Sequence, residues 1–269
     1  MGVVNVSGRA TEVVWFAQAT ARPTIVFLHE GLGSALQWRE FPGDLAAAVG
    51  CGAVALSRRG YGASDPLAAP WPASFLHDEA ALLPELLEAA GVELPRASAG
   101  DKNIIGPQTA PILFGHSDGG SIALIAAAQG LPVSALILEA AHVFVEDRTS
   151  AGITAARDWY ASGLRQRLAK WHGEKTDATF AAWAQVWLSA EFGRLDLLPL
   201  LPQITAPTLV MQGGSDEYGT LAQVDAIANA VGGLVEMLVL PDCGHAPHRD
   251  QRKAVLEAVQ GFLYRHVLA

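Results

Sequence analysis

The chain has 269 residues, 51% hydrophobic and 17% charged, so it can bury a large core and is not expected to be disordered. Its formal net charge is -9 and its sequence pI is about 5.3, which argues against a nucleic acid partner because phosphates repel an acidic surface. Its two cysteines, Cys51 and Cys243, are too few for a disulfide scaffold and fit a reducing compartment.

The beginning of the chain and its apolar runs do not suggest export or membrane insertion. Residues 1–10 contain one arginine and lack the apolar segment of a signal peptide. The most apolar run, residues 122–128, is far shorter than the roughly 18 residues that a membrane helix needs. We therefore expect a cytoplasmic protein that has no membrane partner and acts on a small molecule; its oligomeric state is not indicated.

In the first part of the chain, apolar runs of strand type alternate with helical patterns. Strands are predicted over 11–17, 24–29 and 53–57, with helices over 38–49 and 75–90. Pro84 lies near the middle of the second helix, where a bend is expected. Residues 94–110 hold two prolines, two glycines and small polar residues, which predicts a long surface loop.

The same alternation continues toward the end of the chain. Strands are predicted within 111–120, 133–140, 207–212 and 234–240, and helices over 121–130 and 249–268. Strands that alternate with helices predict a mostly parallel sheet covered by helices on both faces. Residues 142–206 interrupt this rhythm, because they are helical in pattern and contain four of the seven tryptophans: Trp159, Trp171, Trp183 and Trp187.

A nucleophile motif lies between a predicted strand and a predicted helix. The sequence GHSDG at 115–119 matches G-x-S-x-G, in which a serine occupies a sharp turn and glycines let the backbone pass close by. The turn would lift Ser117 above the sheet, and the following helix would point its N-terminus at the negative charge that develops there. The surrounding strand and helix make this weak pentapeptide a specific signal.

With these motifs the chain resembles the α/β-hydrolase superfamily, in particular its small members with a helical cap. The resemblance covers an HG-x-like loop at 29–34, a G-x-G-x-S turn at 60–64, and the elbow at 115–119, followed by an acid and a histidine. It implies an α/β-hydrolase fold with a core of residues 1–141 and 207–269 and a cap of residues 142–206. It also implies a triad in the order Ser, Asp or Glu, His.

Ser117, Asp216 and His245 follow that order and are the predicted nucleophile, acid and base. His245 comes after a glycine behind the last strand, whereas His248 is interpreted as a surface or helix-start residue. Asp216 lies in the loop after the strand 207–212. Glu139 and Asp242 are its rivals as the acid, and Glu139 is the serious one because some members of the superfamily place an acid at that strand end.

The loop at 29–34 predicts an oxyanion hole made by the backbone N–H groups of Gly31 and Asp118. Glu30 departs from the usual glycine at its position, and a link to Arg58 or Arg59 is the favoured interpretation; Ser57 replaces a common Asp. His116, next to the nucleophile, is interpreted as a packing residue. Six residues are predicted to contribute to the pocket: His29, Glu30, His142, Trp159, Trp183 and Trp187.

These features predict a serine hydrolase of the carboxylesterase type, which cleaves an ester-like bond through an acyl-enzyme intermediate. No cofactor is expected, and the sequence contains neither metal-ligand spacing nor a phosphate-binding loop. Three alternatives stay open: a carbon–carbon bond hydrolase, a cofactor-free oxygenase of the same fold, and a small-molecule receptor that retains the triad.

Overall fold

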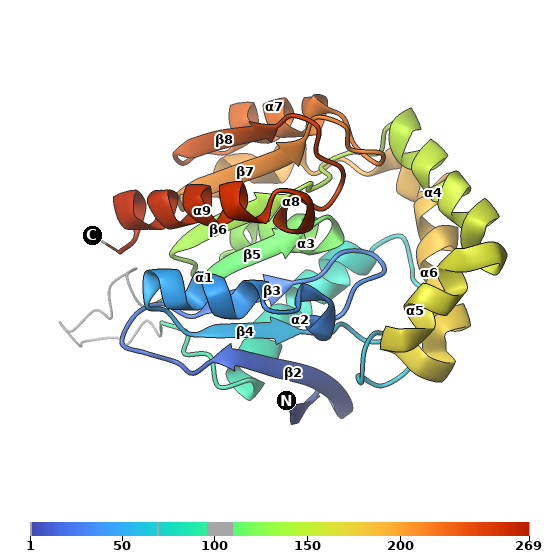
Figure 1. Cartoon of the computed structure of the whole chain (residues 1–269), viewed down its shortest axis with the longest axis horizontal. Coiled ribbons are helices and arrows are strands. Elements are labelled where there is room, and N and C mark those ends of the chain that lie inside the picture. The colour runs from blue at the N-terminus through green and yellow to red at the C-terminus, as the bar shows by residue number, and fades with distance from the viewer. Residues whose placement is uncertain (1, 69, 96–109, 269) are drawn as a thin grey trace.

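The computed structural model describes residues 2–68, 70–95 and 110–268 and contains an eight-stranded sheet (Figure 1). The strand order is β1-β2-β4-β3-β5-β6-β7-β8, in which β2 runs antiparallel to both neighbours and every pair from β4 to β8 is parallel. The strands are β1 Gly2–Val6, β2 Arg9–Ala17, β3 Ile25–Leu28, β4 Ala53–Leu56, β5 Ile112–His116, β6 Ala135–Glu139, β7 Thr208–Gly213 and β8 Val235–Leu240.

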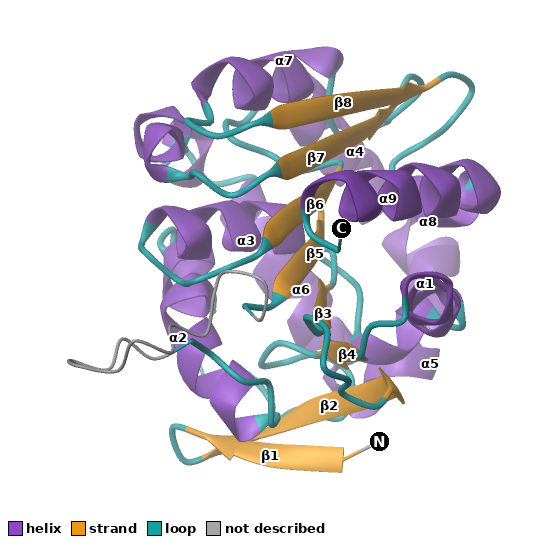
Figure 2. Ribbon diagram, turned by 90° about the vertical axis from the view of Figure 1, so that its left-hand side faces the viewer, coloured by secondary structure: helices purple, strands orange, loops and turns teal. Residues whose placement is uncertain are grey.

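Helices cover both faces of this sheet, which confirms the predicted fold class (Figure 2). One face carries α1 and α9, and the other carries α2, α3 and α7. Every residue of β3, β4, β5, β6 and β7 is buried, as the continuous apolar runs of these strands require in a sheet covered on both faces. These helices are α1 Phe41–Val49, α2 Phe75–Ala89, α3 Asp118–Ala128, α7 Leu221–Ala230 and α9 Arg252–His266.

Between β6 and β7 the chain forms a group of helices that stands over the carboxyl ends of the parallel strands (Figure 1). They are α4 Asp147–Trp159, α5 Arg165–His172 and α6 Thr176–Trp187. Leu168, Trp183 and Trp187 belong to the same apolar cluster as residues of α2 and α3, so these helices share the core of the sheet. None of the helices in the described part of the chain is long and apolar enough to cross a bilayer.

The boundaries of some elements differ from the sequence expectation. The edge strand β1 was not predicted, because most of its residues are exposed or half-buried and its apolar pattern is weak. Helix α3 begins at Asp118, three residues earlier than the predicted start at 121, because the glycines after the nucleophile lie inside its first turn. Of the loop predicted over 94–110, residues 96–109 lie outside the described residues.

The turn from β5 into α3 brings two backbone segments unusually close together. A methyl group on Gly119 would lie 2.0 Å from the carbonyl oxygen of Leu28, well inside van der Waals contact. Leu28 ends β3, the strand that pairs with β5, so a side chain at position 119 would push α3 away from the sheet. The second glycine of the nucleophile motif is therefore required by packing.

We predict that Gly119→Ala lowers the free energy of unfolding by at least about 2 kcal/mol, since the backbone that it would strike cannot move aside. The matched control is Gly43→Ala in α1, where an added methyl group meets nothing within 4 Å. That substitution is expected to raise stability by at most roughly 0.5–1 kcal/mol, since alanine loses less backbone freedom than glycine on joining a helix and Gly43 lies in the first turn. Urea unfolding of both variants measures the difference, and a Gly119→Ala protein of native stability contradicts this account.

Candidate active site

Ser117 occupies the single residue between β5 and α3 and has backbone angles of φ 53° and ψ −117°. Residues other than glycine rarely adopt such a positive φ, so the surrounding structure must hold it. Its N–H donates to the carbonyl oxygen of Glu139 at 2.8 Å, which ties the turn to the neighbouring strand β6. The side chain lines a cavity of about 600 Å³ between the sheet and α4–α6.

His245 and Asp216 come from the loops that follow β8 and β7, and they meet beside Ser117. The Nδ1 atom of His245 lies 2.9 and 2.8 Å from the two carboxylate oxygens of Asp216. Burial alone would favour a neutral carboxyl, but the imidazole of His245 and the N–H of Tyr218 outweigh it and lower the pKa of Asp216. Asp216 is therefore an ionised acceptor that fixes the proton of His245 on Nδ1.

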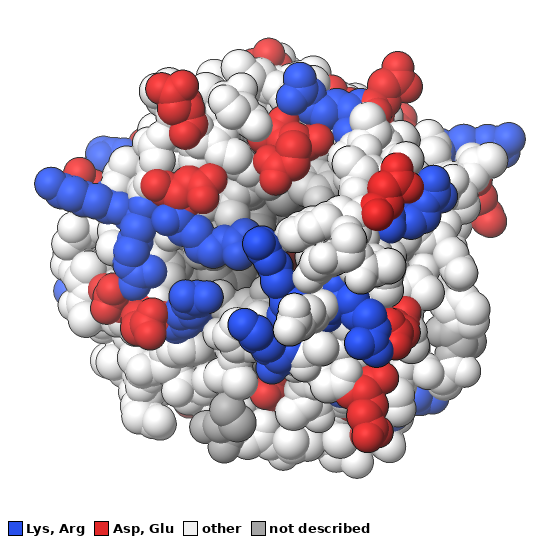
Figure 3. Space-filling model, turned by 45° about the vertical axis from the view of Figure 1, so that its right-hand side comes forward, with Lys and Arg blue, Asp and Glu red and all other residues white. Residues whose placement is uncertain are grey.

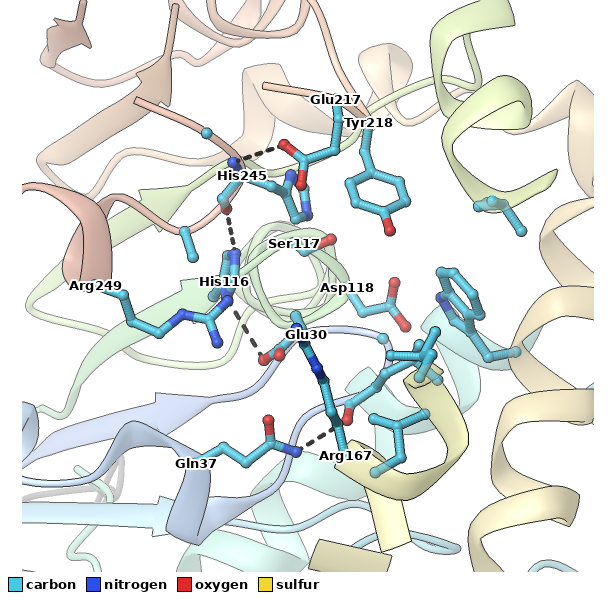
Figure 4. Close-up of a pocket in the computed structure, with 18 of the residues that line it drawn as sticks. Glu30, Gln37, His116, Ser117, Asp118, Arg167, Glu217, Tyr218, His245 and Arg249 are labelled. Carbon is cyan, nitrogen blue, oxygen red and sulfur yellow. Dashed lines mark hydrogen bonds and ion pairs between the residues drawn. The ribbon is translucent and has the colours of Figure 1, made fainter. Parts of the chain in front are cut away.

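This tautomer leaves the other ring nitrogen of His245 with a lone pair. Figure 4 shows the imidazole beside the hydroxyl of Ser117 at the floor of the pocket, with both residues facing the same space. The backbone of His245 is held on both sides: its N–H donates to Glu217 at 3.2 Å, and its carbonyl oxygen accepts from Nε2 of His116 at 2.6 Å. The base is thus positioned by its main chain as well as by its ring.

His116 is buried next to two carboxylates, which sets its charge. Its Nδ1 lies 3.6 Å from the carboxylate of Glu30, and β5 places it opposite Glu139 of β6. Burial disfavours a charged imidazole, but Glu139 and Glu30 outweigh it and raise the pKa of His116 to about 9. A protonated His116 donates from Nε2 to His245 and turns Nδ1 toward the Glu30 carboxylate, so it is more than the packing residue that its position in the motif suggested.

The sequence interpretation expected the carboxylate of Glu30 to be linked to an arginine, and the structure shows that it is not. Its carboxylate faces His116, and Arg58 instead donates to its backbone carbonyl oxygen at 2.8 Å. The second nitrogen of Arg58 pairs with Asp118 at 3.1 Å, and both of these side chains are buried. Burial opposes ionisation of Glu30, but His116 and Arg249 overcome it and hold the pKa of Glu30 well below its usual range.

Glu139, the rival candidate for the acid, is bound to a different histidine. Its carboxylate oxygens lie 3.0 and 2.9 Å from Nδ1 of His248 and also accept the N–H of that residue at 2.5 Å. His248 belongs to the short helix α8, Pro247–Asp250, so the helix-start interpretation is right, but the residue is buried rather than at the surface. Glu139 and His248 form a second, enclosed carboxylate–histidine pair below the first.

These two residues and His116 bring side-chain nitrogen and oxygen atoms within 4.8 Å of one another, a spacing that a metal ion could use. Hydrogen bonds engage much of this group, since Glu139 binds Nδ1 of His248 and Nε2 of His116 donates to the carbonyl oxygen of His245. We therefore interpret the cluster as a buried polar network that supports the floor of the pocket.

The amides of Gly31 and Asp118 border the pocket, where an oxyanion hole was expected. Asp118 is the first residue of α3, so its N–H lies at the positive end of the helix and has no partner within that helix. A methyl group on Gly31 would lie 2.2 Å from Nε1 of Trp183, which requires glycine in this loop. In the part of the chain that the structure describes, neither amide donates to another residue.

The structure brings five of the six predicted pocket residues to the cavity wall: Glu30, His142, Trp159, Trp183 and Trp187. His29 does not line it, which corrects the sequence expectation. Its ring is buried, donates to the carbonyl oxygen of Glu30 at 2.7 Å and accepts the N–H of Arg58 at 3.0 Å, so it shapes the loop from behind. Burial and the nearby charge of Arg58 keep the pKa of His29 well below its usual range.

Sequence reasoning missed several residues of the wall, including Tyr218, Trp171 and the basic residues of α5. Tyr218 lies two residues after Asp216, and its ring centroid is 4.7 Å from that of His245. Its place next to a predicted triad residue was the one available signal. The residues of α5 carried none, since only the packing of the inserted helices decides which of their sides faces the pocket.

The profile of the alpha/beta hydrolase family matches residues 25–258 of this chain. The chain belongs to the alpha/beta hydrolase family. No curated protein sequence matches it significantly. Among solved structures, a membrane phospholipase A described as a bacterial virulence factor is 20% identical with a TM-score of 0.78, covering 100% of this chain and 86% of that one.

Two further members of this α/β-hydrolase fold are similar over their whole length. An esterase from Exiguobacterium antarcticum is 21% identical with a TM-score of 0.72, covering 98% of this chain and 100% of its own. A serine hydrolase involved in carbazole degradation is 17% identical with a TM-score of 0.73, covering 98% of both chains. At these identities the likeness to solved structures establishes the fold alone. The substrate of this member of the hydrolase family has to be inferred from its own pocket.

The raised pKa of His116 predicts a pH dependence of stability. Because the pKa is about 9 in the folded chain and about 6.5 when unfolded, the stabilisation is complete below about pH 6.5 and is lost as the pH rises toward 9. We expect the free energy of unfolding to fall by roughly 1–3 kcal/mol across this range. In His116→Gln that part of the decrease should disappear. Denaturant unfolding at pH 6.5, 7.5 and 9 measures it, and an equal slope in the variant contradicts the assignment.

Proposed function

We propose that this protein is a serine hydrolase of the carboxylesterase type, which cleaves an ester of a small molecule through an acyl-enzyme intermediate. One observation carries the proposal: Ser117, held at a positive φ, faces the same cavity as His245, whose Nδ1 is bound by both oxygens of Asp216. A nucleophile, a base and an orienting carboxylate in this arrangement are the requirements of acyl transfer.

In the first half-reaction, His245 takes the proton of Ser117 as the serine oxygen attacks the ester carbonyl carbon. The carbonyl oxygen gains a negative charge, which the N–H groups of Gly31 and Asp118 stabilise together with the positive end of α3. When the carbon–oxygen bond to the alcohol breaks, His245 returns the proton to the departing oxygen. Asp216 stabilises the imidazolium that exists between these two proton transfers.

In the second half-reaction, water takes the place of the alcohol. His245 accepts a proton from this water, whose oxygen attacks the acyl carbon, and then gives that proton to Ser117 as the acid is released. The sequence of steps uses only side chains and amides of the chain itself. The two carboxylates nearest the reaction, those of Glu30 and Asp118, are paired with His116 and Arg58, which keeps their charge from opposing the oxyanion.

The pocket supports a small, partly aromatic substrate. Its volume of about 600 Å³ lies within the range typical of small-molecule sites, and tryptophans from α4, α5 and α6 form its outer wall. The pKa of His142, lowered to about 4 by burial and by His245, leaves a neutral ring beside the base. The esterase from Exiguobacterium antarcticum shares this fold, which is consistent with the proposal.

We predict that Ser117→Ala abolishes turnover of p-nitrophenyl acetate, because no other group can form the acyl-enzyme. The loss should approach the whole contribution of the triad, with only a residual rate from the oxyanion hole. The variant should unfold at the same denaturant concentration as the original protein, which separates a catalytic effect from a structural one. A fluorophosphonate probe should label the original protein and not the variant.

Three outcomes refute the ester proposal. Near-native turnover by Ser117→Ala would mean that another nucleophile acts. A single burst of p-nitrophenol without further turnover would indicate a receptor that merely acquires an acyl group. Sustained cleavage of a carbon–carbon bond substrate, with slow ester turnover, would move the chemistry to that class.

We predict that Asp216→Asn lowers kcat on the order of 10⁴-fold, because the amide holds His245 in the wrong tautomer. Glu139→Gln should leave kcat within about threefold, since Glu139 binds His248 and not the base. Its effect should appear in stability instead, where breaking a buried pair costs about 3–5 kcal/mol. Steady-state kinetics and urea unfolding of the two variants are the measurements, and the reverse ranking in kcat would make Glu139 the acid.

A further inference from the structure

The mouth of the pocket carries four basic side chains in a chain whose net charge is -9. They come from both sides of the opening: Arg39 and Arg249 from the core, and Arg167 and Lys170 from α5. All four are exposed, and Figure 3 shows basic side chains gathered along the hollow between the core and the inserted helices. We refer to these four residues as the basic rim.

The four side chains of the basic rim stand apart from the close ion pairs of the described residues. Among the described residues, no ion pair within 4.0 Å joins any of the four to an aspartate or a glutamate. Two of the four carboxylates that line the same pocket are paired with buried cations, Asp118 with Arg58 and Glu30 with His116, although Glu30 also feels the charge of Arg249. The other two, Glu217 and Asp250, accept the backbone N–H groups of His245 and Gly244. Since none of these carboxylates forms a close ion pair with the rim, the N–H donors of its four side chains are available to a bound molecule.

Arg167 is partly fixed in place before any ligand arrives. Its guanidinium carbon lies 4.7 Å from the centroid of the Trp159 ring, a cation–π contact that orients the side chain. Figure 4 shows Arg249 and Arg167 reaching into the pocket region from different sides. A guanidinium offers paired N–H donors that match the oxygens of a carboxylate or a phosphate, and less side-chain freedom is lost when the group is already oriented.

Ser117 lies on the floor of this pocket, with the basic rim at its opening. We infer that the rim binds an anionic group of the substrate, a carboxylate or a phosphate, at the end remote from the bond that is cleaved. This inference rests on the proposed hydrolase function and names its substrate class: esters that carry a negative charge away from the reacting carbonyl. The concave site also concentrates the field of the four cations, which favours the arrival of an anion.

The test compares matched esters that differ in this charge. On the acyl side, the 4-nitrophenyl monoester of glutaric acid is compared with 4-nitrophenyl valerate; on the alcohol side, 4-acetoxyphenyl phosphate is compared with 4-acetoxyanisole. We expect the anionic member of at least one pair to have a kcat/KM about tenfold higher or more, and the pair that responds identifies the anion and its side. Raising the salt concentration should reduce the preference.

Variants of the rim locate the effect. Arg167→Gln and Arg249→Gln should each lower the ratio of anionic to neutral kcat/KM at least about threefold, and Arg167→Lys should retain part of it, because the charge stays while the paired donors are lost. The matched control is Arg194→Gln, an exposed arginine of the inserted segment that does not line the pocket. It should leave both rate constants of each pair unchanged.

A binding measurement gives a readout that does not depend on turnover. Phenyl phosphate should bind the Ser117→Ala protein in calorimetry at least about tenfold more tightly than phenol does, and Arg167→Gln should weaken it. Preference for the neutral member in both pairs, or a ratio equally sensitive to Arg194→Gln, overturns the basic rim as a binding site. Failure of the hydrolase proposal looks different, because the esters would then show no sustained turnover that depends on Ser117, whereas the binding of phenyl phosphate and its loss in Arg167→Gln would remain measurable.

Discussion

The backbone of Ser117 is the constraint on which the rest of the site depends. A positive φ at one residue turns the chain from β5 into α3, and the strain is held by the bond from its N–H to Glu139 and by the contact of Gly119 with the Leu28 carbonyl. Because α3 starts immediately after the serine, its first amide lies beside the nucleophile. The same turn places His116 under the loop that carries His245. Geometry at one residue therefore sets the positions of the nucleophile, the oxyanion amides and part of the support for the base.

Below this turn, alternating charges form a connected layer. Asp216 is ionised and holds His245, while His116 is cationic between Glu30 and Glu139, and Glu139 in turn binds His248. Each buried charge has an opposite neighbour, as a low-dielectric interior demands. The departure at Glu30 becomes understandable in this setting. An isolated carboxylate near an oxyanion would be unfavourable, and the proton on His116 compensates for it.

The sequence was sufficient for the fold class and for the candidate triad, because both depend on local signals. Apolar runs locate the buried strands, and G-x-S-x-G is a short motif whose context is a strand and a helix. The acid was harder to identify, since Glu139 ends β6 and Asp216 follows β7, and only the positions of His245 and His248 in space separate the two carboxylates. The role of His29 and the position of Arg167 at the rim of the pocket could not be predicted from the sequence. The first depends on which way a loop folds, and the second on which side of α5 faces inward.

The contact between Trp183 and Gly31 has a consequence for how molecules pass in and out. Trp183 and Trp187 belong to the core cluster, so the inserted helices cannot lift away without exposing large apolar side chains, each worth roughly 1.5–3 kcal/mol of burial. This packing therefore holds the inserted helices against the core, and they do not form a hinged lid over the pocket. In the proposed reaction, the substrate and both products therefore pass between walls that are held in place by this packing. For the hydrolase that we propose, the consequence is that the size of a molecule is selected on entry, before any bond is broken.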